Sequence, residues 1–372
     1  MTRRFLRTGR TRVAVSAAAL LASTLALAAC SSGSDSSSSE TPTGSTSASA
    51  EAPDALRIGF FPNLTHAPAF IALQEGYYKD ALSDLDVKPA PTLFNAGPDA
   101  VTALLSNSID IAYLGPNPTV QAWTTSEGKG IQVISGAASA GASFVVSKDI
   151  TSAADLKGKT VSTPQLGNTQ DVALKYWLQQ QGIQVSADGS GEVTVTNASN
   201  SDIVTAFQSG DISGAWVPEP YAQELIQAGG HVLVNEASLW PKGQFVTTNI
   251  AVRTDFLDQY PDIVQAFLKA NEEALAFIKK NPQQAQTEFN AGLSALTGSS
   301  IDTAVLPDAW NQVTFTDNPL KATLVESAAH AVKVGLLDQS AIDGAGGFDP
   351  LYNLTLLNKV RAQEKLPPLP TS

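Results

Sequence analysis

An internal repeat with an offset of 103 residues constrains the fold of this 372-residue chain more than any other feature. The identical pairs are Asp99/Asp202, Val101/Val204, Thr102/Thr205, Ala103/Ala206, Ser106/Ser209, Ile109/Ile212 and Ala112/Ala215. The same offset aligns residues 56–60 with residues 159–163. Chance similarity among small residues is the alternative explanation. A true repeat predicts two similar lobes.

Each copy begins with a predicted strand, a turn and a helix. In the second copy, residues 159–163 form the strand, Gly167 and Asn168 the turn, and Thr169 starts a helix that Gly182 ends. In the first copy the strand is 56–60 and the helix 67–75. Such a unit directs free backbone N–H groups and a positive helix end toward one point. Taken alone, it is also explained by a turn with a threonine N-cap.

The alternation of strands and helices continues through both copies and predicts sheets with parallel strands and covering helices. Ligands bind beyond the carboxyl ends of strands in such sheets. Four loops occupy that position: 62–66, 115–117, 166–169 and 216–219. We expect Pro118 and Pro220 at first helical positions, behind Asn117 and Glu219 as N-caps.

The repeat also predicts the domain limits. Residues 55–140 and 246–372 form lobe 1, and residues 141–245 form lobe 2, with hinges near 139–143 and 244–250. The helical patterns at 263–280 and 321–337 are placed mainly behind lobe 1.

The first 54 residues have a different composition. Five arginines precede an apolar run, 13–29, in a stretch without acidic residues, which is typical of a signal peptide (1–29). Its ending, Leu-Ala-Ala-Cys30, resembles the lipobox of a bacterial lipoprotein, which implies lipidation of Cys30. A transmembrane anchor is the alternative. Residues 31–50 contain 13 Ser or Thr, so 30–54 is predicted to be a flexible tether.

Charge and cysteine usage exclude several classes of function. The formal net charge is −12, and removal of the signal peptide with its five arginines lowers it to −17. No basic cluster indicates nucleic-acid binding. Cys30 is the single cysteine, so no disulfide or thiol chemistry is expected. The three histidines are far apart in the sequence, and we expect no metal site and no cofactor.

Four segments resemble the nitrate/sulfonate/taurine branch of substrate-binding proteins for ABC importers, and especially the aliphatic sulfonate-binding proteins. They are 61–69 (Phe-Pro-Asn-Leu-Thr-His-Ala-Pro-Ala), 114–118 (Leu-Gly-Pro-Asn-Pro), 166–169 (Leu-Gly-Asn-Thr) and 216–221 (Trp-Val-Pro-Glu-Pro-Tyr). The resemblance covers about 55–340. It implies a two-lobed α/β fold of the type II periplasmic-binding-protein (Venus flytrap) class, with mixed sheets and a helical C-terminal region. Gram-positive relatives are lipid-anchored.

The loops contain no Arg or Lys, although Lys148 and Lys175 lie nearby in the sequence. A monoanion can be held instead by helix N-termini and neutral donors, whereas a dianion usually meets a guanidinium. The candidate ligand-binding residues are Asn63, Thr65, His66, Gly115, Asn117, Ser143, Gly167, Asn168, Thr169, Trp216 and Glu219. Trp216 is as well explained as a core residue, Glu219 as a helix cap, and His66 as a structural residue.

We therefore expect a monomeric receptor on the outer face of the cytoplasmic membrane, held there by lipid on Cys30. It would deliver a small organic anion, an aliphatic sulfonate first of all, to an ABC permease. Nitrate, taurine or a neutral heterocycle such as a thiamine-pyrimidine or flavin precursor remain alternatives. A thiamine-pyrimidine synthase-like enzyme is the least favoured, because that family carries a cysteine-rich motif and this chain has no cysteine after Cys30.

Overall fold

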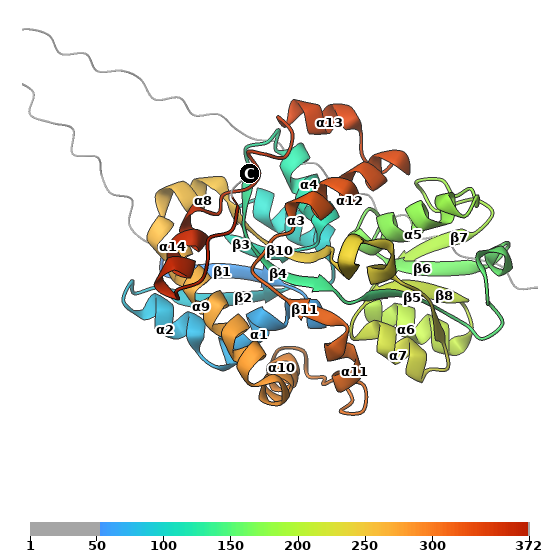
Figure 1. Ribbon diagram of the computed structural model, residues 1–372, viewed down its shortest axis with the longest axis horizontal. Coiled ribbons are helices and arrows are strands. Elements are labelled where there is room, and N and C mark those ends of the chain that lie inside the picture. The colour runs from blue at the N-terminus through green and yellow to red at the C-terminus, as the bar shows by residue number, and fades with distance from the viewer. Residues whose placement is uncertain (1–52, 371–372) are drawn as a thin grey trace, which may run out of the picture. The chain divides into compact units, whose positions relative to one another are not determined.

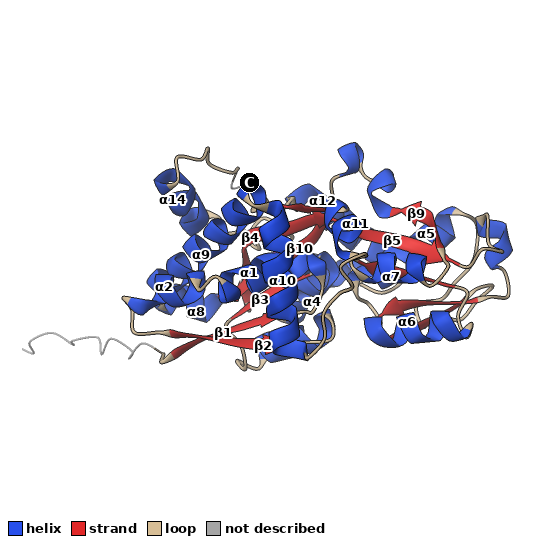
Figure 2. Cartoon of the chain, turned by 90° about the horizontal axis from the view of Figure 1, so that it is seen from below, coloured by secondary structure: helices blue, strands red, loops and turns tan. Residues whose placement is uncertain are grey.

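The computed structural model describes residues 53–370. Cys30, the predicted signal peptide and nearly all of the predicted tether lie outside these residues. The described part contains two mixed sheets covered by helices, which confirms the predicted two-lobed α/β architecture (Figures 1 and 2). Among residues 53–370, no helix is both long enough and apolar enough to cross a bilayer.

The first lobe contains a six-stranded sheet of order β11-β4-β10-β3-β1-β2. Its strands are β1 (Ala55–Phe60), β2 (Lys88–Leu93), β3 (Ile111–Leu114), β4 (Ile131–Ala140), β10 (Val246–Arg253) and β11 (Val313–Phe315). β1 lies parallel to both β2 and β3, whereas β10 runs antiparallel to β3 and β4.

The second lobe contains a five-stranded sheet of order β7-β6-β8-β5-β9. Its strands are β5 (Ala142–Val146), β6 (Thr160–Pro164), β7 (Thr194–Ala198), β8 (Gly214–Pro218) and β9 (His231–Asn235). β6 lies between two parallel neighbours, β7 and β8, as β1 does in the first lobe, and an antiparallel strand follows in each case. The shared order agrees with the repeat of 103 residues.

Helices cover both faces of each sheet (Figure 1). The helices are α1 (Ala67–Gln74), α2 (Tyr77–Ser83), α3 (Gly97–Leu105), α4 (Pro116–Thr125), α5 (Thr169–Gln180), α6 (Asn200–Ser209), α7 (Tyr221–Gln227), α8 (Thr254–Gln259), α9 (Pro261–Lys280), α10 (Pro282–Thr297), α11 (Leu306–Asn311), α12 (Lys321–Lys333), α13 (Gln339–Gly344) and α14 (Thr355–Gln363). The 3₁₀ helices are Leu64–His66, Ala153–Leu156, Glu236–Leu239 and Pro241–Gly243.

The chain passes between the sheets twice. β4 ends at Ala140 and β5 begins at Ala142, with Gly141 between them at φ +77°. This left-handed conformation favours glycine. The return lies between Asn235, where β9 ends, and Val246, where β10 begins. The predicted limits, 55–140 with 246–372 and 141–245, remain a prediction.

Two helices start at other residues than predicted. Pro116, not Pro118, is the first residue of α4, and Gly115 is its N-cap. Proline fixes φ at a helical value and needs no N–H partner in the first turn, so the earlier proline already starts the helix. α7 begins at Tyr221, so that Pro220 precedes it.

The C-terminal helices do not all lie behind the first lobe. α9 packs against α1 and α2, α10 packs against α1 and α9, and α14 packs against α9. α12 instead contacts both α4 of the first lobe and α5 of the second. The imidazole of His330 on α12 stacks on the ring of Tyr176 on α5 with ring centroids 3.7 Å apart. α12 therefore bridges the lobes.

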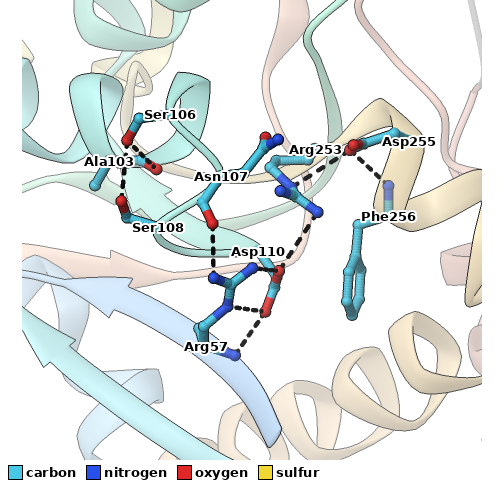
Figure 3. A network of polar contacts seen from close by, with 9 residues as sticks. All are labelled: Arg57, Ala103, Ser106, Asn107, Ser108, Asp110, Arg253, Asp255 and Phe256. Carbon is cyan, nitrogen blue, oxygen red and sulfur yellow. Dashed lines mark hydrogen bonds and ion pairs between the residues drawn. The ribbon is translucent and has the colours of Figure 1, made fainter. Parts of the chain in front are cut away.

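A buried ion-pair network lies at the amino-terminal end of the parallel strands (Figure 3). The carboxylate of Asp110, just before β3, accepts from the backbone N–H and the guanidinium of Arg57 on β1. The guanidinium of Arg253, at the end of β10, lies 3.6 Å from the same carboxylate and 3.3 Å from that of Asp255. Arg57 and Arg253 are thereby held at the opposite end of the sheet from the loops that follow β1 and β3.

Replacement of Asp110 by Asn should destabilise the fold. The carboxylate is 1% exposed, and its loss leaves the guanidinium of Arg57 without a counter-charge and that of Arg253 with Asp255 alone. Because Arg57 is partly exposed to solvent and Arg253 keeps Asp255, we expect the free energy of unfolding in urea to fall by about 1–2 kcal/mol. Glu127→Gln is the control, because the ion pair of Glu127 with Lys129 is fully at the surface. Equal unfolding midpoints for Asp110→Asn and wild type would contradict this account.

Candidate ligand-binding site

The loops that follow β1, β3, β6 and β8 bring the two lobes into contact; we call these loops the inter-lobe site. The backbone N–H of Leu64 donates to the carbonyl of Glu219 over 3.0 Å. The hydroxyl of Tyr221 donates to the carbonyl of Pro62 over 3.1 Å. The amide of Gln165 donates to the carboxylate of Asp99 over 3.0 Å. Segments that are 66 to 159 residues apart in sequence therefore meet between the lobes.

Ten of the eleven predicted residues are buried, and Gly167 is half-buried. Burial alone does not distinguish a ligand contact from a core residue, so the partners of each side chain decide what it can do.

In the first lobe, the imidazole of His66 is a structural group. Its Nδ1 accepts from the backbone N–H of Phe61 over 3.2 Å, and its ring packs on the rings of Phe61 and Tyr113. Burial lowers the pKa of His66 to about 3. The ring is therefore neutral at neutral pH and supplies no positive charge to an anion.

The amide of Asn117 is also occupied. Its Oδ1 accepts from the hydroxyl of Ser327 over 2.8 Å, and its Nδ2 donates to the carbonyl of the same serine over 3.3 Å. The Asn117 side chain therefore fastens α4 to α12. By contrast, Oδ1 of Asn63 is buried without a hydrogen-bond partner. The methyl group of Thr65 lies near Gly141, where the chain crosses to the second lobe.

In the second lobe, a buried carboxylate holds the turn before α5. Asp171 Oδ2 accepts from the backbone N–H of Gly167 over 2.9 Å and from the ammonium of Lys175 over 2.8 Å. Its Oδ1 accepts from Thr163 and Asn197. Lys175, 1% exposed at its side chain, therefore neutralises Asp171 and does not face a ligand.

Trp216 and Glu219 have partners within the second lobe. Trp216 Nε1 donates to a carboxylate oxygen of Glu236 over 2.7 Å, and its ring stacks on Phe144 in the core. Burial raises the pKa of Glu236 to about 7. Glu219 accepts from the backbone N–H of Gln223 in the first turn of α7, and burial raises its pKa to about 8. These contacts fit the structural alternatives given in the sequence analysis: Trp216 is a core residue, and Glu219 binds a backbone N–H at the start of a helix.

The two lobes also approach each other closely at Gly115 and Thr169. A Cβ atom at position 115 would lie 2.3 Å from Oγ1 of Thr169, so only glycine fits there. Asn168 lies near Gly97 of the first lobe, because its Oδ1 would be 3.2 Å from a Cβ atom at position 97. The hydroxyl of Thr169 is buried and has no hydrogen-bond partner. Ser143, on β5 beside the crossing, is 5% exposed.

Two residues that the sequence analysis missed belong with this group. Thr248 and Asn249 lie on β10, where Asn249 pairs with Leu114, the residue before Gly115. Both are fully buried, and neither the hydroxyl of Thr248 nor either polar atom of the Asn249 amide has a partner. Three polar residues, Thr247, Thr248 and Asn249, inside the otherwise apolar run 245–252 were the available signal. Buried amides are normally hydrogen-bonded, so unpartnered ones are candidates for ligand contact.

The described residues offer the site neither a free arginine nor a metal centre. Arg57 and Arg253 bind Asp110, and Arg361 pairs with Asp317. No group of three or more His, Cys, Asp or Glu in residues 53–370 could hold a metal ion. The inter-lobe site contains an unpartnered Thr169 hydroxyl and an unpartnered amide oxygen of Asn63. The unpartnered Thr248 hydroxyl and Asn249 amide lie on β10, next to the strand that leads into the loop after β3.

Comparison with known proteins identifies the family. Residues 49–291 match the NMT1-like family. The chain belongs to this family. It is 32% identical over 212 residues to the taurine-binding periplasmic protein of Escherichia coli, covering 55% of this chain and 62% of that protein. It is 26% identical over 247 residues to the nitrate/nitrite binding protein NrtA of Synechocystis, covering 59% of this chain and 52% of that protein.

The fold matches that of solved binding proteins. The alkanesulfonate-binding protein SsuA from Xanthomonas axonopodis pv. citri, bound to MOPS, superposes with a TM-score of 0.66 at 18% identity. The match covers 80% of this chain and 99% of that one. The architecture is thus the periplasmic-binding-protein fold that the resemblance implied. The chain spans about six tenths of the length of the first curated relatives it matches.

Replacement of Gly115 by Ala should hold the lobes apart. The new methyl group would overlap Oγ1 of Thr169, so we expect small-angle X-ray scattering to give a larger radius of gyration than for wild type. Gly344→Ala is the control, because nothing lies within 4 Å of a Cβ there. Adding Thr169→Ala to Gly115→Ala should restore the wild-type curve. Identical curves for Gly115→Ala and wild type would show that the lobes do not meet at these residues in solution.

Proposed function

We propose that the protein is an extracytoplasmic solute-binding receptor that delivers a small organic anion, an aliphatic sulfonate, to an ABC importer. Family membership, the two-lobed fold and relatives named for taurine, nitrate and alkanesulfonate binding support this proposal. Lipid on Cys30 would hold the receptor on the outer face of the cytoplasmic membrane, and it would act as a monomer with a permease partner. The relatives are binding proteins, and nothing favours an enzymatic activity.

The choice of a monoanion rests on one observation: among residues 53–370, the unpartnered polar groups at the inter-lobe site include no cation. The hydroxyls of Thr169 and Thr248 and the Nδ2 of Asn249 can each donate to an anion. A sulfonate spreads one charge over three acceptor oxygens, so several neutral donors can satisfy it. A dianion would instead require a guanidinium or ammonium group, and those of Arg57, Arg253, Arg361 and Lys175 are engaged in ion pairs.

A second candidate ligand class is an aminosulfonate, as in taurine. Among the unpartnered atoms are two amide oxygens, Oδ1 of Asn63 and Oδ1 of Asn249, which accept hydrogen bonds and do not donate them. An ammonium group would satisfy such oxygens, whereas a plain alkanesulfonate or nitrate would leave them without partners. A neutral heterocycle also carries both donors and acceptors, but its binding would not depend on the negative charge.

We propose that the ligand's anionic head lies between the start of α5 and the loop after β1, with Asn168 and Thr169 among its donors. In this arrangement the alkyl group would extend along the inter-lobe contact near Ser143 and Gly115. Asn63, Thr65, Thr248 and Asn249 would complete the polar lining. Trp216, Glu219, Asn117 and His66 would act indirectly, since their own partners hold the loops in place.

Thr169→Ala and Asn168→Ala should each weaken sulfonate binding roughly ten- to hundredfold. A lost donor that faces a buried anion costs about 1–3 kcal/mol, which corresponds to that factor. Titration calorimetry with ethanesulfonate and with taurine measures the effect. Thr205→Ala, an exposed threonine on α6 of the same lobe, is the matched control and should bind like wild type. The unfolding temperature without ligand should change little in all three variants.

Two outcomes would contradict the proposal. Unchanged affinity in both Thr169→Ala and Asn168→Ala would place the anion elsewhere. Wild-type protein that binds a neutral aminopyrimidine but no sulfonate would favour the heterocycle.

A further inference from the structure

A cavity of about 870 Å³ lies on the first lobe, away from the inter-lobe site, and no candidate ligand residue lines it. It is enclosed by the second half of α9, the end of β11 with the residues after it, and α14 with the residues after it. Its volume is within the range of small-molecule sites. The apolar part of the wall consists of Leu275, Ala276, Ile278, Phe315 and Leu366.

One wall of the cavity is built around a paired arginine. The guanidinium of Arg361 forms an ion pair with Asp317, and its Nε donates to the carbonyl of Pro367 over 2.7 Å. Both side chains are nearly buried. The positive charge of Arg361 therefore already has a counter-charge, and its hydrogen bonds hold the C-terminal segment against the cavity.

The carboxyl group of Glu272 lines the cavity but has no partner for one of its oxygens. Glu272 is 7% exposed, and its Oε1 is buried without a hydrogen bond. A buried carboxyl oxygen without a donor is costly. Three further carboxylates (Glu273, Asp317, Glu364) and three cations (Lys279, Lys280, Arg361) also line the cavity, so the unpartnered oxygen of Glu272 is the feature that favours a positive charge at this point.

We propose that this cavity is a second binding site, which takes a small organic ammonium ion with a hydrocarbon body. The ammonium group would donate to Glu272, and the hydrocarbon part would lie against Ile278, Phe315 and Leu366. Lys279 and Lys280 are exposed residues of the cavity lining and repel additional positive charge, which favours a monoamine over a polyamine. A metal ion does not fit, because the described residues hold no group of three or more metal-ligating side chains.

The protonation of Glu272 gives this proposal a thermodynamic signature. The pKa of Glu272 is raised to about 8, chiefly by burial. The negative charges of Asp317 and Glu364 raise this pKa further, and the positive charge of Arg361 lowers it. At pH 7 the free carboxyl group is therefore mostly protonated. Binding of an ammonium ion requires the carboxylate form, so the proton leaves to solvent as the amine binds. Affinity should increase with pH up to about 8.

Titration calorimetry with n-hexylammonium chloride tests the site. At pH 7, nearly one proton should be released per amine bound. The binding enthalpies observed in phosphate and in Tris should therefore differ by nearly the full difference between the ionisation enthalpies of the two buffers. Glu272→Gln should weaken binding roughly ten- to hundredfold and abolish the proton release, because the charged hydrogen bond is lost. Glu288→Gln, an equal change of charge on α10 outside the cavity lining, should alter affinity less than threefold. The neutral n-hexanol should bind at least tenfold more weakly than the amine.

The outcomes separate this site from the inter-lobe site. Thr169→Ala should bind hexylammonium like wild type, and saturating ethanesulfonate should not compete with it. Absence of hexylammonium binding, equal binding of hexanol, or unchanged affinity in Glu272→Gln would each overturn the proposal, whatever the inter-lobe site binds.

Discussion

The buried carboxylate of Asp171 is the interaction on which the geometry of the inter-lobe site depends most. Its two oxygens accept from Thr163, Asn197, the backbone N–H of Gly167 and the ammonium of Lys175. These partners tie the end of β6, β7, the glycine turn and α5 to one point. The turn is thereby fixed before any ligand arrives, which reduces the ordering cost of binding. Lys175 makes the cluster neutral, so that a buried negative charge does not oppose an anion nearby.

Three arginine side chains are held in ion pairs and are not free to bind an anion at the inter-lobe site. Arg57 and Arg253 share Asp110 at the far end of the first sheet (Figure 3), and Arg361 pairs with Asp317. With a net charge of −12, the protein does not attract anions over long distances. Recognition of an anion therefore rests on short-range hydrogen bonds from neutral groups. Such a site is suited to ligands whose single charge is spread over several oxygens.

The fold and the positions of the loops could be predicted because they depend on sequence patterns that are local and that occur twice in the chain. The strands 56–60 and 159–163 and the helices after them follow from hydrophobic patterns, glycines and prolines that lie close together in sequence. The structural explanations of two residues were also available from the sequence: the indole N–H of Trp216 donates to Glu236 in the core, and the Glu219 carboxyl accepts from the backbone N–H of Gln223 in the first turn of α7.

The partners of the side chains could not be predicted in the same way, because they come from distant parts of the chain. Asn117 is held by Ser327, 210 residues later. Asn249 belongs to a strand that the sequence marked only as a return crossing, and its importance lies in the missing partners of its amide. The position of Pro116 was sufficient to start α4 two residues earlier than expected. Sequence patterns thus located the loops, whereas tertiary contacts determined which of their side chains are free.

The most direct test of the central claim is calorimetric titration of wild-type protein with ethanesulfonate, taurine and inorganic phosphate at low and high salt. The account predicts saturable binding of at least one sulfonate, with an affinity that changes little with salt because the donors are buried and neutral. It also predicts no binding of the phosphate dianion. Tight phosphate binding that weakens steeply with salt, or no binding of either sulfonate, would contradict it.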